Sequence, residues 1–333
     1  MKQGKVKILS TDPALEGMVA MIKKNLPEYQ GRLDFILSDG SEDNLKEKIG
    51  GADIILGARN KLPGSVLEKA DKAFFLQQVS AGFDNIDLKT ASKKGIKVSN
   101  APGSGVIAVA EHAILLMLAI CKKLVFAHTK TVQNEWVFDQ LMNKIGELHQ
   151  KTLGIVGLGR IGKEVARLAQ AFEMTVQYTD VAPVDTSGFR DEIRFVSLED
   201  LLRSSDFISL HVNLTEETRG FIGAKEFGLM KESAFLINTS RGEVVDTGAL
   251  YEALVKGKIK GAGLDVLPTA GAEISKIDHA DPIYQKLFKL DNVIITPHIA
   301  GATADNVRRT FEIALKNIIR VIHGQKPENV VNF

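Results

Sequence analysis

Residues Gly157, Gly159 and Gly162 form a G-x-G-x-x-G pattern directly after the apolar run TLGIV. The pattern opens a segment with helical periodicity, and Asp180 ends the next strand-like run, 18 residues after Gly162. The first glycine permits a tight turn, the second lets the backbone approach a pyrophosphate, and the third lets helix and strand pack closely. An acid at the end of the next strand binds ribose hydroxyls and repels a 2′-phosphate. The combination predicts a dinucleotide site that favours NAD over NADP.

Three more polar stretches end apolar runs, at the edge where parallel sheets bind ligands. Arg241 follows the run FLIN, where an arginine could clamp a carboxylate or form a surface ion pair. His298 follows NVIITP and could donate a proton or serve as a structural histidine. Ser80, Ala81 and Gly82 end an earlier run, and such small residues could offer backbone N–H groups to an anion. Taken alone, the Arg241 and His298 stretches leave both alternatives open.

Together these stretches resemble the D-isomer-specific 2-hydroxyacid dehydrogenase family. In the family's order, the matching motifs are VSAGFDNID, NAPGSGVIAVAEHAILLMLA, TLGIVGLGRIGKEVA, DFISLHVNLTEETRGFIG, FLINTSRGEVVDTGALYEAL, AGLDV and NVIITPHIAGAT. They cover the chain from about residue 50 to its end. The resemblance implies an NAD-dependent oxidoreductase that interconverts a small 2-oxo acid and its D-2-hydroxy acid, with the active site between two domains.

The resemblance also implies roles for individual residues. Arg241 is similar to the arginine that binds the substrate's carboxylate and carbonyl, and His298 to the acid/base that protonates the ketone oxygen. Ser80, Ala81 and Gly82 match the loop whose amides hold the substrate carboxylate. The expected cofactor-binding residues are Gly157, Gly159, Arg160, Ile161, Gly162, Asp180, Val212, Thr239, Ser240, Asp265, His298 and Gly301.

The stretch GAGLDVLPTAGAEI departs from the family pattern in its second half. Its Asp265 is similar to the acid that holds the nicotinamide carboxamide. The family's glutamate, which raises the pKa of the catalytic histidine, would fall at Ala270, and the next acid is Glu273. Three interpretations remain open: Glu273 reaches His298 through a longer loop, His298 works without a carboxylate partner, or the chain is a catalytically weak or inactive NAD-binding sensor or interaction protein.

The elements that must position these residues alternate between strand-like and helical along almost the whole chain. Such alternation predicts an α/β fold with doubly wound parallel sheets. The resemblance identifies the two domains as a flavodoxin-like substrate domain and a Rossmann NAD-binding domain. The expected strands are 6–10, 33–38, 52–58, 73–80, 96–100, 152–159, 175–180, 194–197, 206–212, 234–240, 261–266 and 292–297.

The last amphipathic segment, 303–322, is too short to form a domain and is expected to pack back onto the first one. The substrate domain is therefore predicted to be discontinuous, with residues 1–102 and 298–333. Residues 103–297 then form the NAD-binding domain, which begins with a long amphipathic helix expected over 105–126.

A segment at about 122–150 has weak periodicity and carries Trp136, the only tryptophan. It resembles the arm with which members of the family embrace a second subunit. The resemblance therefore implies a homodimer.

Composition sets limits on the class of protein. A chain of 333 residues with 44% hydrophobic and 25% charged residues is long enough for two domains with cores of their own. A net charge of +1 gives no reason to expect nucleic acid or membrane partners, and the longest apolar run is shorter than a membrane span.

The single cysteine, Cys121, allows no intramolecular disulfide and favours a cytoplasmic location. No cluster of histidine, cysteine and acidic residues has metal-ligand spacing, so no metal is expected.

Overall fold

The computed structural model of the chain describes residues 5–268 and 282–333. The chain forms two compact units: unit 1 comprises Met1–Gly105 and Ala304–Phe333, and unit 2 comprises Val106–Thr303. The chain thus passes between the units after residues 105 and 303, where the sequence placed the boundaries after 102 and 297.

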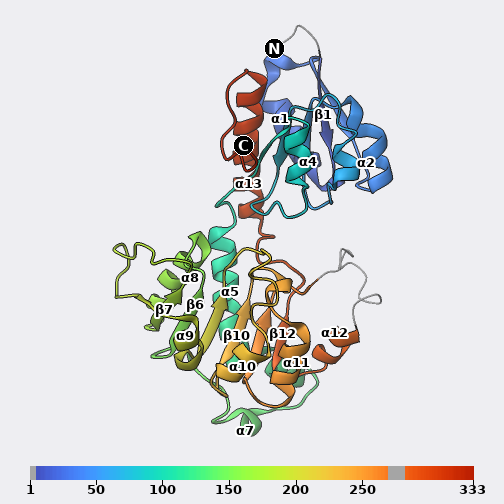
Figure 1. The fold of residues 1–333 in the computed structure, drawn as a ribbon. Coiled ribbons are helices and arrows are strands. Elements are labelled where there is room, and N and C mark those ends of the chain that lie inside the picture. The colour runs from blue at the N-terminus through green and yellow to red at the C-terminus, as the bar shows by residue number, and fades with distance from the viewer. Residues whose placement is uncertain (1–4, 269–281) are drawn as a thin grey trace. The chain divides into compact units, whose positions relative to one another are not determined.

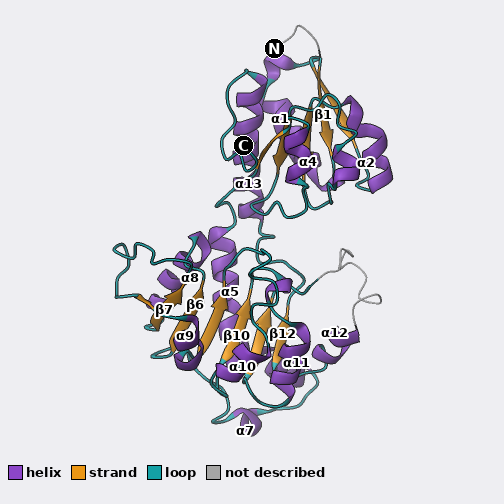
Figure 2. Cartoon of the chain, in the orientation of Figure 1, coloured by secondary structure: helices purple, strands orange, loops and turns teal. Residues whose placement is uncertain are grey.

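Strands and α-helices alternate in both units, and the described residues contain a strand at each expected place (Figure 2). The strands are β1 (Val6–Ser10), β2 (Leu33–Leu37), β3 (Ile54–Gly57), β4 (Phe75–Gln78), β5 (Lys97–Ser99), β6 (Thr152–Val156), β7 (Thr175–Thr179), β8 (Arg194–Phe195), β9 (Phe207–Leu210), β10 (Phe235–Asn238), β11 (Gly261–Leu264) and β12 (Val293–Ile295). The α-helices are α1 (Glu16–Asn25), α2 (Glu42–Lys48), α3 (Gly64–Leu67), α4 (Leu88–Lys93), α5 (Val106–Cys121), α6 (Leu124–Val132), α7 (Phe138–Leu141), α8 (Arg160–Ala171), α9 (Leu198–Ser204), α10 (Ala224–Leu229), α11 (Thr247–Val255), α12 (Pro282–Leu287) and α13 (Ala304–Ile322).

Unit 1 is built on a parallel sheet with the strand order β2-β1-β3-β4-β5, the order of flavodoxin-like folds. Successive side chains of β1 point to opposite faces, so that Ile8 and Leu9 belong to two different hydrophobic clusters. Helices α1 and α13 cover one face, and α2, α3 and α4 cover the other (Figure 1). The C-terminal helix α13 thereby completes the core of unit 1, where Ala314 and Ile318 cluster with Met18 of α1.

Unit 2 contains a parallel sheet with the strand order β12-β11-β10-β9-β6-β7-β8. Counted within the unit, this is the Rossmann order, in which the direction of winding reverses between β6 and β9. Helices α5 and α8 pack on one face, and α9, α10, α11 and α12 pack on the other (Figure 1). The predicted fold class is confirmed. In such sheets ligands bind at the carboxyl ends of the strands beside the reversal.

The helix expected over 105–126 is instead two helices, α5 and α6, separated at Lys123, which has the left-handed φ of 50°. The carbonyl of Cys121 accepts a hydrogen bond from Gly146 N at 2.9 Å, so the returning chain takes the place of a further helical turn. Helix α5 is also buried on more than one side, between α8 and the strands β10 and β11. The prediction of one amphipathic helix was wrong because these contacts come from residues far along the chain.

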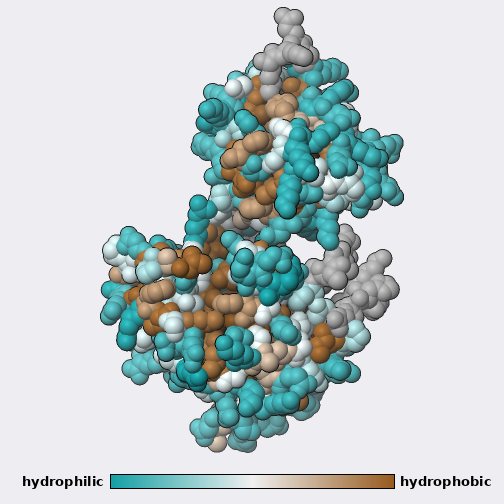
Figure 3. Space-filling view, viewed as in Figure 1, coloured by the Kyte–Doolittle hydropathy of each residue, from teal (hydrophilic) through white to brown (hydrophobic). Residues whose placement is uncertain are grey.

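Hydrophilic residues cover most of the visible surface of each unit (Figure 3). Hydrophobic residues gather over the region of β6 and β10 in unit 2. Within the two described ranges, no helix has both the length and the apolar character needed to cross a membrane.

Candidate active site

The glycine pattern forms a tight turn between β6 and α8. Gly157 has φ +94°, and a Cβ there would lie 2.8 Å from the carbonyl oxygen of His211. A Cβ at Gly162 would lie 2.2 Å from the carbonyl oxygen of Gly157. Because both obstacles are backbone atoms, only glycine fits without a shift of the main chain. Gly159 meets nothing within 4 Å and caps the N-terminus of α8, which leaves the approach to the helix N-terminus open.

Asp180 follows β7 and lies beside the glycine turn. Its carboxylate accepts hydrogen bonds from Leu158 N and from Val181 N, each at 2.8 Å. Each oxygen keeps a lone pair that can accept from a ribose hydroxyl. After β10, the Thr239 hydroxyl is buried and has no hydrogen-bond partner among the described residues, so a polar group of a bound cofactor could satisfy it. These residues fit a dinucleotide.

The side chain of Asn238, the last residue of β10, organises the loop that carries Arg241. Its amide donates to the Arg241 carbonyl at 2.9 Å, and its oxygen accepts from Ser240 N and Oγ at 3.0 and 2.8 Å. A Cβ at Gly242 would lie 2.0 Å from the carbonyl carbon of Leu267. The loop that carries Arg241 therefore packs directly against the chain that leaves β11.

Asp265, which follows β11, holds the turn that carries His298. The carboxylate is 1% exposed and accepts hydrogen bonds from Ile299 N and Ala300 N, each at 2.9 Å. The N–H of His298 donates to the carbonyls of Asp265 and Thr296, at 2.9 and 3.0 Å. His298 itself has the left-handed φ of 56°, which is uncommon for a residue with a side chain. The contacts on both sides of His298 therefore fix an unusual backbone conformation at this position.

His112 of α5 supports the same turn and was missed in the sequence, although it occurs in the quoted motif AEHA. The Thr296 hydroxyl donates to Asp265 at 2.5 Å, so its oxygen is free to accept from His112 Nε2 at 2.9 Å. His112 Nε2 also lies 3.4 Å from Asp265 Oδ1. The only sequence signal was a histidine, next to Glu111, in a helix whose other residues are apolar.

Burial lowers the pKa of His298 below its usual value of 6.5. The charge of Asp265 raises that pKa, Arg241 lowers it, and Glu243 raises it again. Because His298 keeps an exposed surface, solvent moderates these effects. The described carboxylates that favour a protonated His298 are thus Asp265 and Glu243. Glu243 is the second residue that the sequence analysis missed.

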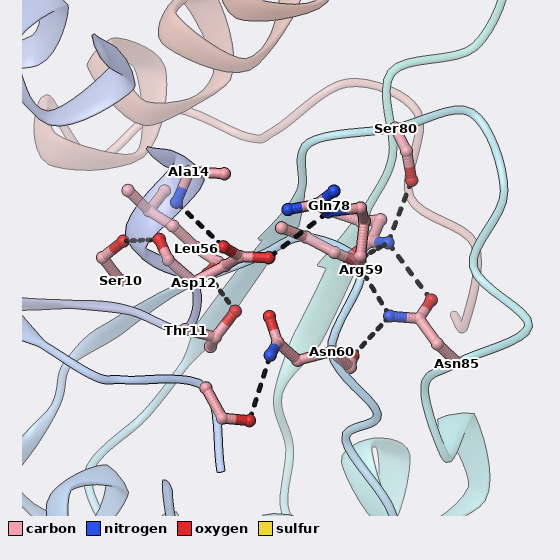
Figure 4. A network of polar contacts seen from close by, with 12 residues as sticks. Ser10, Thr11, Asp12, Ala14, Leu56, Arg59, Asn60, Gln78, Ser80 and Asn85 are labelled. Carbon is pink, nitrogen blue, oxygen red and sulfur yellow. Dashed lines mark hydrogen bonds and ion pairs between the residues drawn. The ribbon is translucent and has the colours of Figure 1, made fainter. Parts of the chain in front are cut away.

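In unit 1, polar side chains gather at the carboxyl ends of β1, β3 and β4 (Figure 4). Ser80 follows β4, and its hydroxyl donates to the Gly82 carbonyl at 2.7 Å. Arg59 follows β3, and its Nε lies 3.5 Å from the Asp12 carboxylate. The expected carboxylate-binding loop therefore lies at the ligand-binding edge of its own sheet.

Comparison with known proteins gives the family. The sequence profile described as "D-isomer specific 2-hydroxyacid dehydrogenase, NAD binding domain" matches residues 114–300, more than half of the chain. The chain belongs to the D-isomer-specific 2-hydroxyacid dehydrogenase family. A glyoxylate reductase of Thermococcus litoralis is 41% identical over 86% of this chain and 86% of its own length. A D-3-phosphoglycerate dehydrogenase of Methanocaldococcus jannaschii is 37% identical over 98% of this chain, which spans 59% of that protein.

Solved structures agree with this family. A D-lactate dehydrogenase of Aquifex aeolicus, complexed with NAD and lactic acid, is 33% identical and has a TM-score of 0.85. The alignment covers 98% of this chain and 99% of that one. The predicted family, the enzyme class of NAD-dependent dehydrogenases acting on CH–OH donors, and NAD as cofactor are confirmed.

In this dehydrogenase, every expected cofactor-binding residue follows the carboxyl end of a strand of the unit 2 sheet. Their individual contacts with NAD stay predictions, as do the roles of Arg241 and His298. Glu273 lies outside the described residues. Among the residues that are described, no group of three or more histidine, cysteine or acidic side chains could hold a metal ion.

We expect His211, which follows β9, to make the stability of this dehydrogenase depend on pH. Although the residue keeps some accessible surface, burial of the imidazole lowers its pKa from 6.5 to about 4. Below pH 6.5 the unfolded chain binds a proton that the folded chain does not, so acidification from about pH 6.5 to 4 is expected to cost about 3 kcal/mol of folding free energy. Denaturant unfolding at several pH values measures the slope.

The variant His211→Asn isolates this contribution, because its loss of stability across the same range should be smaller than that of the wild type. The exposed His323, which lies outside the segment at about 122–150, provides the matched control, and His323→Asn should keep the wild-type slope. Identical pH slopes for the wild type and His211→Asn would contradict the prediction.

Proposed function

We propose that the chain interconverts a small 2-oxo acid and its D-2-hydroxy acid with NAD(H), using His298 as the acid/base and Arg241 to bind the substrate carboxylate and carbonyl. The observation that carries the proposal is the constrained turn at His298. The Asp265 carboxylate accepts hydrogen bonds from the amides of Ile299 and Ala300, the two residues after His298. Arg241 is close enough to His298 to lower the pKa of its imidazole. Arg241 and the His298 turn follow β10 and β12, which flank β11, at the edge where such sheets bind ligands.

NAD bound at the glycine turn and Asp180 would supply the hydride acceptor and, when reduced, the donor. The buried Thr239 hydroxyl, which has no hydrogen-bond partner in the described part of the chain, would be available to a polar group of the bound cofactor. Within that site, the guanidinium of Arg241 holds the substrate carboxylate and polarises the neighbouring carbonyl. The imidazolium of His298 donates a proton to the ketone oxygen as negative charge develops there. In the direction of oxidation, neutral His298 accepts that proton from the hydroxyl.

The names of relatives guide the choice of substrates. Relatives of this chain include proteins named glyoxylate reductase and hydroxypyruvate reductase, and a structural relative was solved with lactic acid. We therefore propose glyoxylate, hydroxypyruvate and pyruvate as the first substrates to test.

The proposal is tested by measuring NADH oxidation with this panel of 2-oxo acids across about pH 5–9. Turnover of at least one acid is expected, with a rate that rises as His298 becomes protonated. Binding of NADH without turnover of any 2-oxo acid would contradict the proposal and favour an NAD-binding sensor of the same fold. The variant Glu273→Gln belongs in the same assay, because an unchanged pH profile would show that Glu273 does not tune His298.

We also propose that the chain forms a homodimer through the segment at about 122–150 and works in the cytoplasm. In that segment Trp136 is 84% exposed, Val132 64% and Phe138 63%, an unusual exposure for large apolar side chains. A second copy of the chain could cover them. Sedimentation of the intact chain measures the stoichiometry, and a monomer at assay concentration would contradict the dimer.

The proposal of a cytoplasmic location is supported by the single cysteine, which allows no intramolecular disulfide and suits a reducing compartment.

A further inference from the structure

The loop of residues 80–83, after β4 of unit 1, has carbonyl groups that all face the protein. The Ser80 carbonyl accepts from Ala101 N at 2.9 Å. The Ala81 carbonyl accepts from Asn100 Nδ2 at 2.6 Å. Two successive peptide groups of the loop are therefore held by the segment that follows β5.

The third carbonyl, that of Gly82, accepts from Ser80 Oγ at 2.7 Å, and that hydroxyl accepts in turn from Gln78 Nε2 at 2.9 Å. The second short contact of Gln78 Nε2 is with the Ala58 carbonyl at 2.8 Å, while Asn85 Oδ1 lies at 3.1 Å and the Gly82 carbonyl at 3.3 Å (Figure 4). Gln78, which is 1% exposed, thus ties the loop after β4 to the loop after β3.

These contacts determine where the N–H groups of the loop point. In a trans peptide, the C=O of one residue and the N–H of the next point in opposite directions. With three successive carbonyls directed inward, the N–H groups of Ala81, Gly82 and Phe83 are directed outward. None of the three donates to an acceptor in the described part of the chain, and the three residues keep accessible surface. Successive N–H groups of this kind form a binding site for an anionic oxygen pair.

We propose that Asn100 and Gln78 are positioning residues for substrate binding, because they direct the amides of residues 81–83 toward the substrate carboxylate. The inference rests on the proposed function and on the family resemblance, by which Ser80, Ala81 and Gly82 match the loop whose amides hold the substrate carboxylate. Neither side chain is assigned a contact with the substrate: Asn100 acts through the Ala81 carbonyl, and Gln78 acts through the Ser80 hydroxyl that holds the Gly82 carbonyl. Both are nearly inaccessible, with Asn100 6% and Gln78 1% exposed, so their contacts are with the protein itself.

The variant Asn100→Asp tests the proposal most directly. It keeps the size of the side chain but replaces the amide donor by a carboxylate oxygen, which repels the Ala81 carbonyl and turns that peptide. Binding of oxamate, which carries a carboxylate but accepts no hydride, is measured by calorimetry on the NADH complex. We expect the Kd for oxamate and the KM for glyoxylate to rise roughly tenfold or more, with the Kd for NADH unchanged. The residues expected to bind NADH belong to unit 2, whereas Asn100 belongs to unit 1.

Two further variants separate positioning from general stability. Ser80→Ala removes the hydroxyl that donates to the Gly82 carbonyl and accepts from Gln78 Nε2 at 2.9 Å. Because it introduces no repelling group, it should weaken oxamate binding by a smaller factor. Gln170→Glu is the matched control, because Gln170 is a buried amide of unit 2, 3% exposed, that donates to the Asp191 carbonyl at 2.8 Å. It should lower stability but leave the Kd for oxamate and the KM for glyoxylate as in the wild type.

The outcomes are distinguishable from those of the function test. If the wild type turns over glyoxylate and Asn100→Asp binds oxamate with the wild-type Kd, the positioning role is overturned while the proposed function stands. If Asn100→Asp does not fold, an unchanged Kd in Ser80→Ala overturns it instead. If the wild type binds NADH but not oxamate, the carboxylate site is overturned whatever the turnover assay gives. Weaker oxamate binding in an enzyme without turnover would support the positioning role and contradict the proposed reaction.

Discussion

Replacing His298 by asparagine is expected to lower kcat for reduction of a 2-oxo acid by about 10²–10⁴-fold, the usual contribution of a positioned acid/base. Asparagine suits this test because it tolerates the left-handed backbone that His298 adopts, with φ of 56°. The amides that hold the turn belong to Ile299 and Ala300, so their bonds to Asp265 should survive. The substitution therefore removes the transferable proton while it keeps the turn. Steady-state kinetics with NADH and glyoxylate measure the effect.

The matched control is His149→Asn, because His149 is a surface histidine whose Nδ1 lies 3.3 Å from Glu173. That variant should keep the wild-type kcat. The Kd for NADH should change by less than about threefold in His298→Asn, because the interaction lost is made to the substrate. A kcat within a few-fold of the wild type in His298→Asn would contradict the acid/base role.

The same residue determines the expected pH dependence of the reaction. Burial lowers the pKa of His298 below 6.5, so in the free enzyme the imidazole is mostly neutral at pH 7. Reduction needs the protonated form, so kcat/KM for reduction should rise as the pH falls through that pKa. Oxidation needs the neutral form and should show the opposite trend.

The sequence predicted those parts of the fold that depend on local patterns. Strands were recognisable because apolar runs alternate with turn residues, and even the two-residue strand Arg194–Phe195 fell inside an expected range. The break between α5 and α6 was not recognisable, because it depends on a hydrogen bond from Gly146 to the Cys121 carbonyl. A helix that is apolar on nearly all sides gives no local sign of where a distant segment will end it.

The candidate site also contains residues that the sequence could locate and residues that it could not. Residues at strand ends, such as Arg241 and His298, could be located because the end of an apolar run marks the ligand-binding edge of the sheet. The support of His112 for Thr296 joins residues 184 positions apart, so no spacing in the sequence could indicate it. The electrostatic effect of Glu243 on His298 was also hidden, since the two residues follow different strands, β10 and β12, and lie far apart in the sequence. The sequence directed attention to a missing glutamate, whereas the described carboxylates that act on His298 lie on other elements.

Replacing Asp265 by asparagine should therefore have the second large effect. The buried carboxylate accepts from Ile299 N, Ala300 N and the Thr296 hydroxyl, and the amide nitrogen of asparagine would face at least one of these donors. We expect a loss of about 1–3 kcal/mol in folding free energy, as for other unsatisfied buried donors. A loosened turn should also lower kcat by roughly 10- to 100-fold, because small displacements of a catalytic group are costly.

The loss of charge adds a shift in pH dependence. Asp265 raises the pKa of His298, so Asp265→Asn should lower it further and move the rise in kcat/KM for reduction to lower pH. Glu243→Gln is the matched control, because Glu243 also raises the pKa of His298 but does not accept from the amides of the His298 turn. It should shift the profile in the same direction while keeping the limiting kcat at low pH. If Asp265→Asn reached the wild-type kcat at low pH, the carboxylate of Asp265 in the wild type would act on His298 through charge alone, and the turn would not depend on it.

A titration with NADH tests a third role of Asp265, its predicted contact with the nicotinamide carboxamide. That contact requires weaker NADH binding in Asp265→Asn but not in Glu243→Gln.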